Sequence, residues 1–176
     1  MATNKMIFAG FGGQGVLSMG ISFAYGAMDE NKEATFLPSY GPEMRGGTAN
    51  CHVVVSDTTV ASPLIATADI LVVMNKPSLA KFVDSVKTGG YIFVNSDVCD
   101  AKVEREDVNV IYAPVLSKAI ELGNAKISNT IMLGVIQKHC SVLTDENMLK
   151  GLDHLFESKP KLIPMNHEAY AAGKQM

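Results

Sequence analysis

The hydrophobic residues of this chain fall into short runs that are continuously apolar rather than alternating with polar residues. Five runs are candidate strands: residues 6–9, 53–55, 70–74, 91–94 and 108–112. Strands with apolar residues throughout are covered on both faces, which is typical of a parallel sheet flanked by helices. A sixth candidate strand covers residues 35–37.

Helical periodicity appears between these strands. One face of the first helix carries Val16, Gly20, Phe23, Ala24 and Ala27, where Gly20 and Ala24 are small enough to let a sheet approach closely. A second stripe follows Pro77 through residues 79–86, and a third covers residues 127–136. Thr144 is placed as an N-cap before two acidic residues.

The alternation of strands and helices predicts an α/β fold: a single three-layer α/β/α domain spanning residues 1–176, with a mostly parallel sheet. For the tail, residues 159–176, two alternatives stay open. It forms a short helix packed on the body, or an arm that faces a partner.

Composition narrows the class of protein. Apolar residues make up 47% and charged residues 19% of the 176 positions, which excludes a disordered tail or a coiled coil. The net charge of −3 gives no basic surplus for nucleic acid, and no apolar run is long enough to cross a membrane. The N-terminus resembles no secretory signal.

Three scattered cysteines without a C-x-x-C pair argue against a disulfide framework and against a metal or iron–sulfur site. We expect a cytoplasmic protein with reduced thiols.

A glycine-rich loop follows the first predicted strand and opens the first predicted helix. The candidate binding residues in it are Gly10, Gly12, Gly13, Gln14 and Gly15. Glycines let a phosphate approach the backbone amides, and the positive end of the helix dipole stabilises an anion there. The alternative is a tight turn whose glycines serve packing alone.

A nicotinamide cofactor is the obvious ligand for such a loop, and a self-contained Rossmann-type NAD(P) oxidoreductase stays an alternative. The dinucleotide site, however, needs an acidic residue at the end of the second strand. Here residues 35–37 lead into Pro38, and Glu33 precedes the strand, at the opposite edge of the sheet.

A second motif, residues 38–47, is rich in glycine and proline and is expected to form a shaped loop. Because it follows the second strand, it should lie beside the first glycine loop. Arg45, followed by Gly46 and Gly47, suits a bidentate contact with phosphate or carboxylate. The alternative is a surface loop in which Arg45 is solvated or paired with Glu43.

Three segments, residues 10–16, 39–51 and 74–79, resemble the gamma subunit of 2-oxoacid:ferredoxin oxidoreductases. The resemblance covers roughly residues 6–139 and is strongest to the gamma subunits of the 2-oxoglutarate and 2-ketoisovalerate enzymes. It implies that the complete enzyme decarboxylates a 2-oxoacid with coenzyme A, giving acyl-CoA, carbon dioxide and reduced ferredoxin.

The same resemblance implies where the cofactors lie. Thiamine diphosphate, Mg²⁺ and the iron–sulfur clusters belong to partner subunits. These are the alpha and beta subunits, and whether a ferredoxin-like delta subunit is also present is left open. This chain agrees, because it has no Gly-Asp-Gly segment of a thiamine site and too few cysteines for a cluster. Pairing of the isolated chain as a homodimer is left open.

Coenzyme A binding is the role that the resemblance leaves to this chain. The amides of residues 10–15 would take the diphosphate, and Arg45, with Gly46 and Gly47, the 3′-phosphate or a second diphosphate oxygen. The fused single-chain enzymes carry lysines near the position of Arg45, so we expect weaker phosphate binding here. The residues expected at the subunit interface are Tyr40, Pro42, Glu43 and Met44. No residue is expected to be catalytic, and the chain is not expected to be active alone; a purely structural subunit is the remaining alternative.

Overall fold

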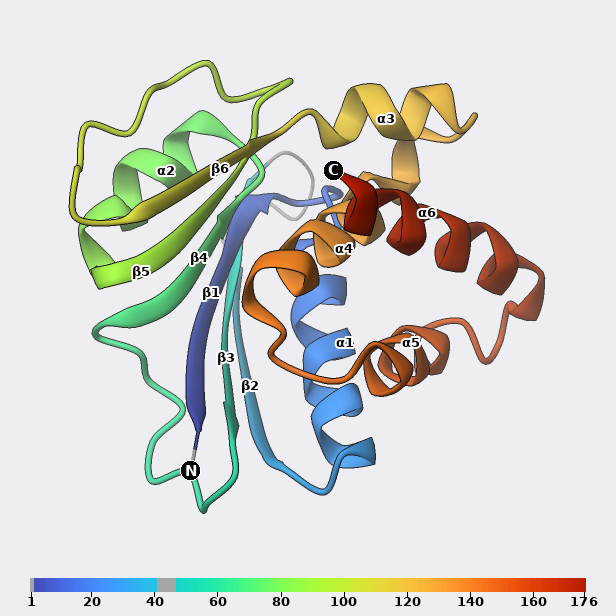
Figure 1. Cartoon of the computed structure of the whole chain (residues 1–176), viewed down its shortest axis with the longest axis horizontal. Coiled ribbons are helices and arrows are strands. Elements are labelled where there is room, and N and C mark those ends of the chain that lie inside the picture. The colour runs from blue at the N-terminus through green and yellow to red at the C-terminus, as the bar shows by residue number, and fades with distance from the viewer. Residues whose placement is uncertain (1, 41–46) are drawn as a thin grey trace.

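A six-stranded sheet runs through the centre of the protein in the computed structural model, which describes residues 2–40 and 47–176 (Figure 1). Its strands are β1 (Thr3–Phe11), β2 (Glu33–Tyr40), β3 (Thr48–Ser56), β4 (Ala68–Val73), β5 (Val86–Asn95) and β6 (Asn109–Ala113). The spatial order is β2-β3-β1-β4-β5-β6. Strands β1, β4, β5 and β6 are parallel, whereas β3 is antiparallel to β1 and to β2. This confirms the predicted α/β fold with a mostly parallel sheet.

Helices cover the two faces of the sheet unequally. The helices are α1 (Val16–Asp29), α2 (Lys76–Phe82), α3 (Val115–Glu121), α4 (Ser128–Cys140), α5 (Asp145–His154) and α6 (Ile163–Gln175), with short 3-10 turns η1 (Val83–Ser85), η2 (Ala125–Ile127) and η3 (Pro160–Leu162). Figure 1 shows α2 on one face and α1, α4, α5 and α6 on the other. No helix among the described residues is long and apolar enough to cross a membrane.

The apolar strands divide their side chains between two cores. Met6 and Phe8 point into the larger core beneath α1 and α4, and Ile7 between them points into the smaller core beneath α2. Both cores are fully shielded from water, which explains why the strands are apolar throughout. Cys51 and His52 also point to opposite faces of the sheet, because successive side chains of a strand alternate between its faces.

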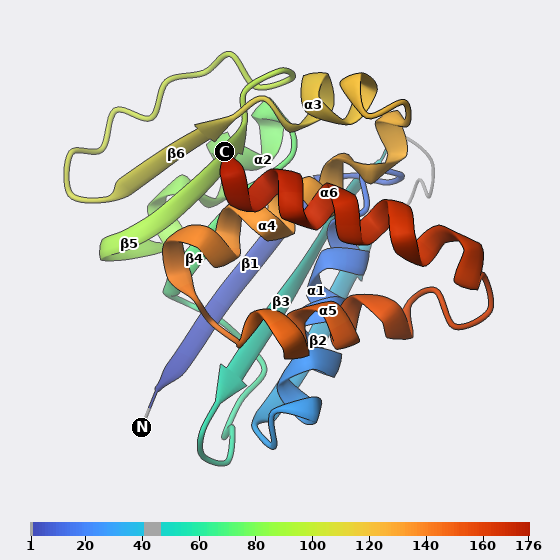
Figure 2. The ribbon, with the colours of Figure 1, turned by 45° about the vertical axis from the view of Figure 1, so that its right-hand side comes forward.

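The larger helical layer consists of two tightly packed pairs, α1 with α5 and α4 with α6, and Figure 2 shows α6 lying over α4 while α5 runs beside α1. A Cβ on Gly151 of α5 would collide with the Ser22 carbonyl and with Gly26 of α1. Likewise, a Cβ on Gly173 of α6 would collide with the Ile131 carbonyl and meet Gly134 of α4. Glycine therefore brings the backbones into contact within each pair.

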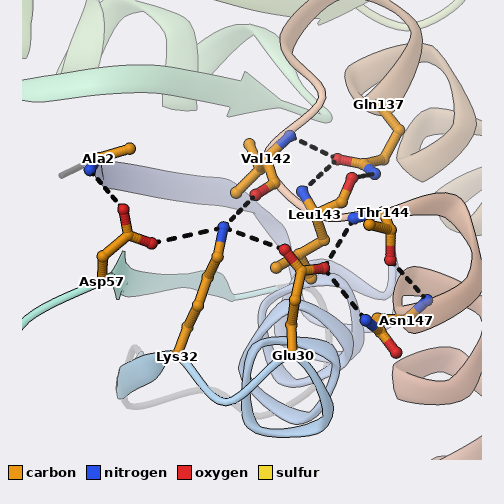
Figure 3. A network of polar contacts seen from close by, with 9 residues as sticks. All are labelled: Ala2, Glu30, Lys32, Asp57, Gln137, Val142, Leu143, Thr144 and Asn147. Carbon is orange, nitrogen blue, oxygen red and sulfur yellow. Dashed lines mark hydrogen bonds and ion pairs between the residues drawn. The ribbon is translucent and has the colours of Figure 1, made fainter.

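A polar network ties the turn after α1 to the turn after α4 (Figure 3). The Lys32 ammonium lies 3.1 Å from the Glu30 carboxylate and 3.8 Å from that of Asp57. Glu30 in turn accepts a 2.8 Å hydrogen bond from the backbone amide of Thr144. Gln137 accepts from the amides of the same α4–α5 turn at 2.9 and 3.3 Å. These contacts fix the α1–α5 pair against the end of α4.

The predicted caps are confirmed. The Thr144 hydroxyl accepts from the Asn147 amide at the start of α5, and Pro77 lies in the first turn of α2, which Asn75 caps through its 2.9 Å bond from Ser78. The tail, left open between a helix and an arm, forms η3 and then α6, which packs on α4.

Two predicted boundaries are wrong. Residues 38–40 continue β2 instead of opening a loop: Pro38 pairs with Cys51 and Tyr40 with Ala49. Because β2 is an edge strand, a proline without an N–H costs it no ladder bond on its open side. The helix after Pro77 ends at Phe82, and Val86 belongs to β5. The Arg105 guanidinium accounts for this, since it donates to the carbonyls of Val83 and Val86 at 2.9 and 2.7 Å.

Candidate binding site at the glycine loop

The glycine loop lies at the carboxyl edge of the sheet, between β1 and β4. The chain leaves β1 toward α1 on one face and leaves β4 toward α2 on the other, so this is the topological switch point of the sheet. In open α/β sheets, ligands bind in the crevice outside such a point. The end of β2 and the start of β3 meet the loop from the other side, because Phe11 pairs with Thr48.

The five predicted loop residues have different tasks. Gly13 and Gly15 have φ angles of 95° and 73°, in the left-handed region that favours glycine. A Cβ on Gly13 would meet nothing within 4 Å, so this glycine borders open space. Gly10 is a packing residue, since a Cβ there would lie 2.7 Å from the Gln14 side chain and 2.9 Å from that of Val16.

Gln14 uses its side chain to hold the loop in place. Its Oε1 accepts a 2.7 Å hydrogen bond from the Phe11 amide, and its Nε2 donates at 2.8 Å to the carbonyl of Met74, directly after β4. Both ends of the carboxamide are therefore bonded within the chain. This side chain links the two strands that flank the switch point.

The amides that remain for a ligand are those of Gly13 and Gly15 in the loop and those at the start of α1. The Gly12 amide donates to the Gly47 carbonyl at 2.9 Å, and the Gln14 amide to Phe11 at 3.2 Å. Helix α1 has no side-chain cap and no acidic residue in its first turn. Before the first helical bond, from Met19 to Gly15, the amides of residues 16–18 find no acceptor among the described residues. A helix terminus of this kind attracts an anion.

A cavity of about 350 Å³ opens beside these amides. It is lined by the loop, the first turn of α1, the end of β2 and the start of β3, including Tyr40, Gly47 and Thr48. Tyr40 is 62% exposed at this edge. The structure thus brings Tyr40 and Gly47 to the glycine loop, as predicted. Pro42, Glu43, Met44, Arg45 and Gly46 lie outside the described residues.

A second cavity, of about 530 Å³, lies on the other side of the same loop and includes polar residues that the sequence analysis did not identify. Both Gly13 and Gly15 border it, together with Lys126 and Asn129. Asn129, in the first turn of α4, reaches the Gly15 carbonyl at 3.5 Å. Lys126 is exposed, and no described carboxylate lies within ion-pair distance of its ammonium. The sequence pattern could not indicate that these two residues lie beside the loop, because more than a hundred positions separate them from it.

Among the described lining residues of the two cavities, the titratable side chains are Tyr40 and Lys126, and none is a carboxylate, a histidine or a thiol. Cys51 lies nearby, but burial raises the pKa of its thiol to about 12, and its Sγ lies 3.6 Å from the Val16 carbonyl. Among the described residues, no group of three His, Cys, Asp or Glu side chains gathers where a metal ion could bind. The arrangement suits recognition of an anion by amides and one lysine.

Comparison with known families gives one consistent result. The family model for pyruvate ferredoxin/flavodoxin oxidoreductase matches residues 5–176. Ketoisovalerate oxidoreductase subunit VorA of Methanothermobacter thermautotrophicus is 41% identical over 97% of this chain, but the match covers 36% of that protein. The chain therefore spans about a third of the length of this relative. The 2-oxoglutarate synthase subunit KorC of Methanocaldococcus jannaschii is 34% identical over 87% of the chain and 82% of the relative.

Solved structures show the same fold. The gamma subunit of a keto/oxoacid ferredoxin oxidoreductase from Geobacter sulfurreducens superposes with a TM-score of 0.83 at 25% identity, covering 98% of this chain and 96% of that one. A 2-oxoglutarate:ferredoxin oxidoreductase from Magnetococcus marinus, solved with 2-oxoglutarate, coenzyme A and succinyl-CoA bound, gives a TM-score of 0.89 at 21% identity. That match covers 99% of this chain and 31% of the other, and it is a likeness of fold.

Proposed function

The chain belongs to the pyruvate ferredoxin/flavodoxin oxidoreductase family, as a gamma subunit, and from this premise we propose that it binds coenzyme A for a 2-oxoacid:ferredoxin oxidoreductase. The complete enzyme would convert 2-oxoglutarate or 2-ketoisovalerate and coenzyme A to acyl-CoA, carbon dioxide and reduced ferredoxin. Alpha and beta subunits, and a ferredoxin-like delta subunit, would carry thiamine diphosphate, Mg²⁺ and the clusters.

The observation that carries this proposal is the uncapped start of α1 beside a lysine that has no described carboxylate partner. The first-turn amides of α1 offer donors to a phosphate, and the 14-residue helix adds its dipole. Lys126 brings a positive charge to the other side of the loop. A coenzyme A diphosphate needs this combination of amides and cation.

The acidic anchor of the competing nicotinamide ligand is not found among the described residues. Glu33 is the first residue of β2 and pairs with Ser56, at the sheet edge opposite the glycine loop. At the loop edge β2 ends in Tyr40, which has no carboxylate for a ribose. The exposed Tyr40 instead offers an aromatic surface beside the cavity, where a partner subunit would close over the ligand.

The proposal also divides the reaction between chains. The titratable side chains among the described lining residues are Tyr40 and Lys126, to which the proposal gives ligand contact and phosphate binding, and none of these residues is a thiol nucleophile. The chain would therefore hold coenzyme A while carbon–carbon bond cleavage and electron transfer take place on partners. We expect the purified chain alone to show no turnover with any 2-oxoacid.

The test compares Ser18→Asp with its neutral isostere Ser18→Asn. Ser18 lies in the first turn of α1 and borders both cavities. An aspartate there favours the helix dipole and so leaves the fold intact, but it repels a phosphate. Isothermal titration of coenzyme A into the full chain and into the assembled enzyme should show at least a ten-fold weaker affinity for Ser18→Asp than for Ser18→Asn.

Lys126→Gln supplies an independent check on the cation. We expect about a five-fold loss of affinity, the size of an exposed ion pair of about 1 kcal/mol, together with a weaker salt dependence. Lys102→Gln, the same charge change over α2 on the other face, should bind like the wild type. Equal affinity of the Asp and Asn variants, or tight NAD binding with none of coenzyme A, would refute the proposal.

A further inference from the structure

The second cavity lies in the seam between the two helix pairs of the larger helical layer. Its lining comes from both pairs: Ser22 and Leu152 from α1 and α5, and Leu133 and Met165 from α4 and α6. Within each pair, glycines bring the backbones into contact. The cavity between the pairs has a volume of about 530 Å³, which is within the range of small-molecule sites.

The lining of the seam cavity combines apolar and polar side chains. The apolar residues are Ile127, Leu133, Leu152, Leu155, Phe156, Leu162 and Met165. The polar side chains deeper in the cavity are already bonded to one another: Thr130 donates to Asn166 at 2.7 Å, and Asn166 to the Leu162 carbonyl at 2.9 Å. At the loop end, the Asn129 carboxamide keeps its oxygen without a donor among the described residues.

The glycine loop separates the two cavities, because Gly13, Gly15 and Ser18 border both. A ligand with its diphosphate at this loop can extend one arm into each. Coenzyme A has this architecture, with adenosine on one side of the diphosphate and pantetheine on the other. We propose, resting on the proposed function, that the seam cavity binds the adenine ring and that pantetheine runs through the cavity beside Tyr40.

The chemistry of the two arms decides the orientation. The thiol at the end of pantetheine must reach an acyl group on another subunit, which favours for this arm the cavity beside Tyr40, a residue that is 62% exposed at the edge of the sheet. Adenine takes no part in the reaction and can be buried. Its flat faces suit the apolar lining and the Phe156 ring, and its amino group suits the free oxygen of Asn129.

Three probes separate the arms: coenzyme A, adenosine 3′,5′-bisphosphate and 4′-phosphopantetheine. Met165→Trp fills the seam, and Met165→Leu is the control of similar volume. In the full chain and in the assembled enzyme, Met165→Trp should bind coenzyme A and the bisphosphate at least ten-fold more weakly than Met165→Leu, with 4′-phosphopantetheine unchanged. An equal loss for all three probes, or no loss, would overturn the assignment.

Phe156→Trp provides a second readout that does not depend on filling the cavity. The sequence has no tryptophan, so this variant carries a single fluorophore in the seam. Coenzyme A and the bisphosphate should quench its emission, and 4′-phosphopantetheine should not. If coenzyme A binds the wild type yet neither variant responds to adenine, the adenine site is wrong while the proposed function stands. If coenzyme A does not bind the wild type, the proposed function itself fails.

Discussion

Gly173→Ala is expected to destabilise the protein, although alanine is the better helix former. In an exposed helical position the exchange would be favourable by about 1 kcal/mol. At Gly173 the new Cβ would collide with the Ile131 carbonyl and lie 2.9 Å from its carbonyl carbon and 3.0 Å from the Gly134 Cα. All three neighbours are backbone atoms, so only a separation of α6 from α4 relieves the overlap.

The magnitude follows from two opposing effects. Overpacking a rigid site costs about 3 kcal/mol at the upper end of the usual range, and the gain in helix propensity offsets about 1 kcal/mol. The net loss is therefore about 2 kcal/mol, which for a domain of this size lowers the melting temperature by roughly 4–8 °C. Urea titration monitored by circular dichroism measures the change in unfolding free energy directly.

The reverse exchange at an exposed position is the matched control. Ala171→Gly, two residues earlier on the same helix, changes only propensity and should cost about 1 kcal/mol. The double variant Gly134→Ala with Gly173→Ala should lose less than the two single losses together, because both Cβ atoms act at one helix contact. If Gly173→Ala is as stable as the wild type, the account of the α4–α6 pair is wrong.

Three further predictions concern the loop and a surface histidine. Gln14→Met keeps the volume but removes both bonds of the side chain, so we expect about 2–3 kcal/mol lower stability in urea titration, and full stability would refute the role of Gln14. Gly13→Ala should lose about 1–2 kcal/mol from its positive φ, measured by thermal unfolding, and Gly15→Ala should lose more because its Cβ would also overlap the Asn129 side chain; a stabilised variant would contradict the backbone assignment. The hydrogen bond that His154 donates to the Glu157 carboxylate and the charge of Asp29 raise the pKa of His154, so its contribution is complete below its unfolded pKa of about 6.5 and is lost as the pH rises through the higher folded value. His154→Asn should remove that part of the pH dependence of the melting temperature; an unchanged profile would show that His154 does not contribute.

The sheet was predictable because burial on both faces leaves a strong signal in the sequence. Residues 70–74 are all apolar, and this pattern indicates a strand whose two faces are both buried. Pro38 was misread because a proline signals a break only if the strand has neighbours on both sides. On an edge strand the same residue is compatible with pairing, and no local pattern distinguishes the two cases.

The geometry of the candidate site was predictable only as far as it is local. The glycine loop lies within six consecutive residues, and its strand–loop–helix context identifies it. Gln14 lies in the same motif, but its role in holding the loop was not predictable, because its side chain donates to the carbonyl of Met74, which follows β4. Lys126 and Asn129 reach the loop because α4 packs beside α1, a contact that depends on helix packing far along the chain.

The helix glycines join the fold to the proposed site. Glycine in a helix interior weakens the helix, so Gly134, Gly151 and Gly173 would be unfavourable unless close packing compensated for them. The compensation is the backbone contact within each pair. The seam cavity lies between the two pairs, and none of these three glycines lines it. The proposed binding of a long, two-armed ligand at the glycine loop would therefore depend on residues that do not touch that ligand.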